Sequence, residues 1–396
     1  MMEAVRPEDV GFSSARLQRI DDAMRRFVDE GKIAGVVTLV ARQGKVAHFG
    51  ATGLMDLEAR RPMEREAIFR IASMAKPITA TSVLILFEEG HFLLDDPVAE
   101  FLPEFKQTKV FVRQTDHGLE VANLERPITI RHLLAHTSGL TYDFYLDPVS
   151  RIYAKEQIQR PDEILADKVR RLAALPLVHQ PGARWTYGVS HDVLGRLVEI
   201  ISGQPFDVFL RQRIFAPLEM TDTGFHVPPP DLSRLASVYT RDGRAGLKRD
   251  EHQPDRSKPP AFLSGGGGLV STAADYWRFC QALLNGGGLS GTRLLGRKTV
   301  ELMTADQWHG ATSPYTPGFP VLPGYGYGLG VRTLVDVARS GVPSSLGEYG
   351  WGGALGTYFW IDPREQMVGV VMVQFVPLDF RPAWTFKVLA YQALVA

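Results

Sequence analysis

The chain has 396 residues, and its 44 Lys and Arg balance its 44 Asp and Glu, so the formal net charge is zero. Nucleic acids and anionic membranes attract proteins with a basic excess, so we expect neither as a partner. Apolar residues make up 45% and charged residues 22%, as in ordinary globular proteins, and the length suggests two or three domains. The one cysteine, Cys280, excludes an intrachain disulfide and a cysteine-rich metal site.

The start of the chain carries charge early and lacks the apolar core of a secretory signal. The longest apolar stretches, such as 36–41 and 367–373, have the length of strands and are too short to cross a bilayer. We therefore expect a soluble cytoplasmic protein.

The first predicted element is an amphipathic helix over residues 13–30, whose apolar side chains share one face. A valine-rich strand follows at 35–42, and a second strand at 45–49 comes after the turn Gln43-Gly44. Two adjacent strands without a crossover helix indicate an antiparallel hairpin, not the start of a doubly wound parallel sheet.

The middle of the chain, from about residue 70 to 320, reads as helices and long loops. The helices predicted there are 78–89, 130–136, 190–202 and 273–284, the last with Thr272 as its N-cap. Strands return at 328–335, 356–361 and 367–375, before a final helix over 382–395.

This order predicts an α+β fold with a discontinuous sheet domain. Residues 1–70 and 322–396 would form one antiparallel sheet flanked by the N- and C-terminal helices. Residues 71–321 would form a mainly helical domain. A small-molecule site is expected in the cleft between the two.

The sharpest chemical signal is the pair Ser73 and Lys76. A serine and a lysine three residues apart on a helix share one face, and the amine can then help to take the hydroxyl proton. Pro77 follows directly and disfavours helical geometry at Lys76, so we expect a tight first turn. Serine–lysine pairs with this spacing are frequent, so the pair gains meaning only from its context.

That context is a series of short segments in a fixed order. They are 128–140 (ITIRHLLAHTSGL), 180–190 (QPGARWTYGVS), 217–220 (PLEM), 264–269 (SGGGGL) and 350–354 (GWGGA). With Ser73 and Lys76, they resemble the serine β-lactamase and penicillin-binding-protein superfamily, and within it the family VIII carboxylesterases. The resemblance runs from about residue 17 to the C-terminus.

The resemblance implies a role for each motif residue. Ser73 would be the acylated nucleophile, Lys76 would share its proton, and Tyr187 would shuttle that proton. Backbone N–H groups of Ser73 and Ala354 would form the oxyanion hole. Trp351, Gly352 and Gly353 would bind the substrate, and the family needs neither metal nor cofactor.

Two departures from the superfamily pattern concern the substrate. Trp351 stands where class C β-lactamases carry the lysine that binds the β-lactam carboxylate, and Val189 stands in place of the motif's asparagine. Both changes favour neutral esters, so we expect a carboxylesterase that cleaves short-chain esters through an acyl-enzyme. A β-lactamase, a D-aminopeptidase or amide hydrolase, an acyltransferase and a non-catalytic ligand-binding module stay open as alternatives, as does a homo-oligomeric state.

Other readings of the sequence are weaker. No serine has the flanking glycines of the α/β-hydrolase nucleophile elbow. His132 and His136 supply half of a zinc site, but we expect a packed or capping role for them. The glycines at 265–268 lack the lysine of a phosphate loop, so they indicate a backbone that passes close to the cleft.

Overall fold

The computed structural model of the chain describes residues 5–116, 118–243, 246–308 and 323–396. Its main feature is an eight-stranded sheet, in which each neighbouring pair is antiparallel. Across the sheet the strands are β12 (Tyr325–Tyr327), β13 (Arg332–Leu334), β14 (Tyr349–Gly352), β15 (Tyr358–Asp362), β16 (Met367–Val373), β1 (Gly35–Arg42), β2 (Lys45–Asp56) and β3 (Arg61–Pro62). The predicted α+β class with an antiparallel sheet is confirmed.

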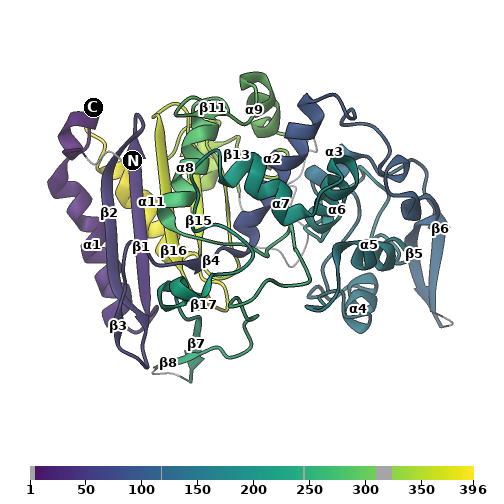
Figure 1. The fold of residues 1–396 in the computed structure, drawn as a ribbon, viewed down its shortest axis with the longest axis horizontal. Helices are drawn as coiled ribbons and strands as arrows, with labels where there is room; N and C mark the ends of the chain where they lie inside the picture. The colour runs from purple at the N-terminus through teal and green to yellow at the C-terminus, as the bar shows by residue number, and fades with distance from the viewer. Residues whose placement is uncertain (1–4, 117, 244–245, 309–322) are drawn as a thin grey trace.

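Both faces of the central strands are buried because alternate side chains enter two different cores. On β1, Val36 and Val40 pack in a core with the apolar face of α1 (Ser14–Asp29) and with α11 (Arg381–Gln392). Val37 and Leu39 of the same strand belong to the larger core, which includes α8 (Ala273–Leu284) and α2 (Ala75–Glu88). Figure 1 shows α1 on the outer side of the sheet and the helical part of the molecule on the opposite side.

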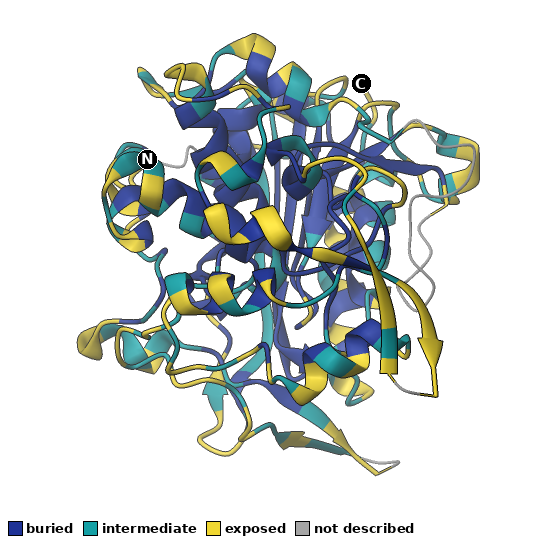
Figure 2. Ribbon diagram, turned by 90° about the vertical axis from the view of Figure 1, so that its right-hand side faces the viewer, coloured by how far each residue is buried: buried dark blue, intermediate teal, exposed yellow. Residues whose placement is uncertain are grey.

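The helical part is centred on α2, which is buried along almost its whole length. Its neighbours along the chain are α3 (Ile130–Leu134), α4 (Pro148–Lys155), α5 (Leu165–Ala173), α6 (Ser190–Ser202), α7 (Phe206–Leu210), α9 (Arg297–Thr304) and, nearer the sheet, α10 (Val337–Ser340). In Figure 2 the buried residues fill the centre of the molecule, and the exposed residues lie on the outer turns of these helices.

Short strands complete the fold. They are β4 (Phe69–Arg70) with β9 (Val270–Ser271), β5 (Lys109–Thr115) with β6 (Gly118–Asn123), β7 (Tyr239–Asp242) with β8 (Gly246–Arg249) and β17 (Phe375–Val376), and β10 (Gly288–Leu289) with β11 (Thr292–Arg293). In the sequence, β4 comes shortly before Ser73, and β9 comes shortly after the glycines at 265–268. Because β4 and β9 pair, they bring these two segments together. No helix among the described residues is both long and apolar enough to cross a bilayer.

The late strands differ from the prediction. The single strand expected at 328–335 is wrong: β12 and β13 are separate strands joined by a turn in which Gly330 has φ +85°. Strand β14, which carries Trp351, was not predicted, because its glycines weaken the strand pattern. The helix α8 lies in the middle of the sequence, yet it packs on β1 and β16. The expected domain boundary at 321–322 lies outside the described residues.

Candidate active site

Ser73 lies in a short 3₁₀ turn, Ala72–Met74, that leads straight into α2. Ala72, directly before it, has φ +45°, a conformation that a residue with a Cβ rarely adopts. Pro77 fits the third position of α2, because the first N–H groups of a helix have no partner within the helix. The expected tight turn is the 3₁₀ turn Ala72–Met74, directly before α2. Ser73, at its centre, lines a cavity.

Lys76 is fully buried, and its amine has three acceptors. Its Nζ donates to Ser73 Oγ at 3.1 Å, to the hydroxyl of Tyr142 at 3.1 Å and to the carbonyl of Gly266 at 2.7 Å. A lysine ammonium has three N–H groups, so each of them can be satisfied here. This explains how a charged side chain tolerates complete burial beside the serine.

Tyr187 lies beside the same amine. Lys76 Nζ is 4.6 Å from the centroid of its ring, and its hydroxyl accepts a hydrogen bond from Trp351 Nε1 at 3.4 Å. The structure therefore brings Ser73, Lys76, Tyr187 and Trp351 to one place, although they come from three distant parts of the sequence.

Tyr142 was missed from the sequence. Its ring lies 5.3 Å from the ring of Tyr187 and stacks on Phe144 at 5.0 Å. Burial, together with the nearby Tyr187 and Asp192, raises the pKa of Tyr142 well above its usual range, so this phenol stays protonated. The one signal in the sequence was its position two residues after the segment 128–140.

The histidines near the site are neutral. Burial lowers the pKa of His136 well below its usual range, and His191 and Lys76 lower it further. Burial and then Lys76 lower the pKa of His191 in the same way. His132 lies apart from them, where it exchanges hydrogen bonds with Thr129 at the start of α3, so its predicted capping role is confirmed. Neither His136 nor His191 carries charge for an ion pair at neutral pH.

The end of β14 and the turn after it face Ser73. The hydroxyl of Thr357 donates to the carbonyl of Ile71 at 3.2 Å, and the N–H of Gly353 donates to the carbonyl of Thr357 at 2.7 Å. A Cβ on Gly353 would lie 2.2 Å from Thr357 Oγ1 and 2.5 Å from the Ile71 carbonyl oxygen, so only glycine fits. These contacts link the turn that carries Ala354 to the residues just before Ser73.

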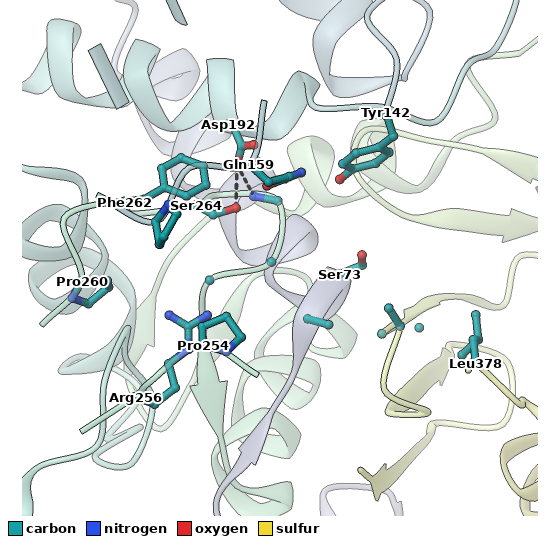
Figure 3. Close-up of a pocket in the computed structure, with 18 of the residues that line it drawn as sticks. Ser73, Tyr142, Gln159, Asp192, Pro254, Arg256, Pro260, Phe262, Ser264 and Leu378 are labelled. Carbon is teal, nitrogen blue, oxygen red and sulfur yellow. Dashed lines mark hydrogen bonds between the residues drawn. The ribbon is translucent and has the colours of Figure 1, made fainter. Parts of the chain in front are cut away.

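The cavity in front of Ser73 has a volume of about 770 Å³. Its walls come from both parts of the molecule (Figure 3), with Tyr142 and Asp192 on the helical side. Trp351, Gly352, Gly353 and Ala354 line it on the sheet side. Phe144 and Phe262 add apolar surface. The volume lies within the ~300–1,000 Å³ typical of pockets that bury a drug-sized ligand.

Residues 20–392 match the family model described as Beta-lactamase. The chain belongs to the β-lactamase family. It is 34% identical over 374 residues to Esterase EstB of Burkholderia gladioli, which covers 89% of this chain and 88% of that protein. It is 32% identical over 388 residues to Lovastatin esterase of Penicillium rubens, covering 91% of this chain and 94% of that protein.

A solved structure has the same fold. EstCE1, described as a hydrolase with promiscuous acyltransferase activity, matches with a TM-score of 0.81 and 28% identity over 95% of this chain and 99% of that one. The chain is therefore a carboxylesterase, a serine hydrolase with the β-lactamase fold, as its motifs suggested.

Proposed function

We propose that Ser73 is the nucleophile of a two-step ester hydrolysis. Its hydroxyl attacks the ester carbonyl, the alcohol leaves, and water then releases the acid from the acyl-enzyme. The observation that carries this proposal is the 3.1 Å hydrogen bond between Lys76 Nζ and Ser73 Oγ at the wall of the cavity.

Lys76 and Tyr187 have different roles toward the proton of the Ser73 hydroxyl. With all three N–H groups of Lys76 directed at acceptors, its ammonium holds the serine oxygen and places positive charge at the ring of Tyr187. Of the two phenols at this amine, we assign Tyr187 to proton transfer, because it matches the tyrosine of the family motif and its ring centroid lies nearer to Lys76 Nζ, at 4.6 Å against 5.6 Å for Tyr142.

The oxyanion of the tetrahedral intermediate is held by backbone N–H groups of Ser73 and Ala354. Two aligned donors of this kind typically supply a few kcal/mol of transition-state stabilisation. The hydrogen bond from Thr357 to Ile71 supports this assignment, because it fixes one donor segment against the other.

The substrates are short-chain esters without a negative charge at the position that Trp351 occupies. Trp351 is 3% exposed and offers an indole where a β-lactamase has a lysine, and Val189 is fully buried and has no group that binds an amide. The volume of the cavity leaves room for a bulky alcohol beside a short acyl group.

Steady-state kinetics test this proposal. We expect a higher kcat/KM on p-nitrophenyl butyrate than on a chromogenic cephalosporin, and covalent labelling of Ser73 by a serine-directed phosphonate. Ser73→Ala should abolish both turnover and labelling. Labelling at another residue, or faster turnover of the cephalosporin, would contradict the proposal.

Acyl transfer is a second candidate, and the size of the cavity favours it. A cavity of about 770 Å³ can hold an acceptor alcohol next to the acylated serine, and EstCE1 is described with such an activity. Adding a primary alcohol to the esterase assay should then divert product from the free acid to the new ester. Chromatography of the products measures the ratio of ester to acid. An unchanged yield of acid would reject acyl transfer and leave hydrolysis as the one supported activity.

A further inference from the structure

A buried ion pair lies beside the cavity that Ser73 lines. Lys168 of α5 and Asp192 of α6 approach to 2.8 Å between Nζ and Oδ2, and their side chains are 0% and 2% exposed. Neither residue belongs to a motif that the esterase mechanism uses. Buried pairs of this kind often add little stability, so the position calls for another explanation.

The second oxygen of Asp192 holds the glycine segment of the cavity wall. Asp192 Oδ1 accepts from Ser264 Oγ at 2.7 Å and from the N–H of Gly266 at 3.0 Å, the two dashed bonds in Figure 3. Asp192 therefore accepts two hydrogen bonds through Oδ1 and forms the ion pair with Lys168 through Oδ2. Although burial raises its pKa, Lys168 and these hydrogen bonds keep the pKa of Asp192 below its usual value, so the carboxylate stays ionised.

Gly266 is also the residue that holds Lys76. Its carbonyl accepts from Lys76 Nζ at 2.7 Å, while its N–H is fixed by Asp192. The peptide group before it is fixed at both ends, because Thr79 Oγ1 donates to the carbonyl of Gly265 at 2.8 Å. Gly265 has no room for a side chain, since a Cβ there would lie 2.4 Å from the carbonyl oxygen of His191.

We propose that Asp192 is a positioning residue for Lys76, acting through Gly266. This inference rests on the proposed function of Ser73 and Lys76 and adds the group that sets the direction of the amine. By accepting the Gly266 N–H, Asp192 orients the Gly266 carbonyl, and that carbonyl holds one N–H of Lys76 so that another meets Ser73 Oγ. Lys168 supplies the charge that allows a carboxylate to do this in a buried place.

Two double variants separate the acceptor from the charge. Lys168→Met with Asp192→Asn removes both charges but keeps an oxygen that can accept the Gly266 N–H. Lys168→Met with Asp192→Ala removes the same charges and the acceptor as well. The two proteins have equal net charge, and both lack the buried lysine.

We expect the alanine double variant to lose about 10- to 100-fold in kcat on p-nitrophenyl butyrate, because small misplacements of a reacting group are costly. KM should change less than kcat, because Asp192 contacts Lys168, Ser264 and Gly266, and the proposed esters carry no charge for it to bind. The asparagine double variant should stay within about fivefold of the unmodified protein in kcat. The rate of Ser73 labelling by the phosphonate should likewise be lower in the alanine double variant than in the asparagine double variant.

Equal kcat values for the two double variants, or an effect on KM alone, would overturn the positioning role. If the alanine variant does not fold, Thr79→Val is the second test, because it keeps the shape but removes the donor at the other end of the fixed peptide group. It should lower kcat about 3- to 10-fold at unchanged KM, and full activity of this variant would then reject the proposal. An unmodified protein that neither hydrolyses the ester nor labels at Ser73 would instead overturn the proposed function, and this inference with it.

Discussion

Lys76 shows how far a single residue depends on groups that are distant in the sequence. Its spacing from Ser73 could be read from the sequence, because three residues on a helix place two side chains on one face. Tyr142 and Gly266 could not be identified as its other partners, since they lie 66 and 190 positions away. Only the fold shows which groups accept hydrogen bonds from its amine.

The two phenols at Lys76 should differ strongly when each is replaced. Tyr187→Phe should lower kcat on p-nitrophenyl butyrate by about 10²- to 10⁴-fold, because it removes the group assigned to proton transfer. Tyr142→Phe is the matched control, and we expect less than about a tenfold loss, since it removes only one acceptor from Lys76. Steady-state kinetics with both variants measure this difference, and the opposite order would assign proton transfer to Tyr142.

At the scale of elements, the predictions succeeded where the local pattern was strong. The amphipathic helix α1, the valine-rich strand β1 and the helix α8 with its Thr272 cap are present within a residue or two of the expected bounds. They failed where glycine allows a chain to be either strand or turn, as between β12 and β14. There, strand pairing decides the structure, and pairing partners cannot be read from one segment.

A substitution in the turn after β14 tests whether this turn supplies part of the oxyanion hole. Gly353→Ala should lower kcat by about 100-fold, because its Cβ would overlap Thr357 Oγ1 and the Ile71 carbonyl and displace the turn that bears Ala354. Gly246→Ala is the control, since the nearest atom to its Cβ is 3.9 Å away. Kinetics and thermal unfolding of both variants check this, and a fully active Gly353→Ala protein would contradict the assigned oxyanion hole.

At the scale of the whole molecule, charged contacts tie the small strands to the main sheet. Asp56, at the end of β2, accepts from Arg249 of β8 at 2.7 Å, from Arg61 of β3 at 3.1 Å and from the N–H of Ala59 at 2.8 Å. Burial raises the pKa of Asp56, but these three donors outweigh it and lower the pKa to about 2. A carboxyl with a lowered pKa stabilises the folded state above its usual pKa of about 4 and loses that effect as the pH falls toward 2.

Asp56→Asn should therefore lower the free energy of unfolding at pH 7 by about 1 kcal/mol, allowing for screening by solvent. The difference from the unmodified protein should shrink between pH 4 and pH 2 and disappear below that range. Urea unfolding at several pH values measures it. Asp116→Asn, in an exposed turn, is the control and should show no such loss; a difference for Asp56→Asn that grows at low pH would contradict the assignment.

The pairing of β1 with β16 has a consequence for how the protein is made. These strands form the middle of the sheet, yet one comes early and the other late in the sequence, as in the register of Val36 with Val373. While the ribosome is still translating, β1 therefore has one open edge, and the nucleophile exists long before the turn opposite it. A growing chain can therefore complete the active site only after almost all of it has emerged, and until then the β1–β2 hairpin keeps an unpaired edge.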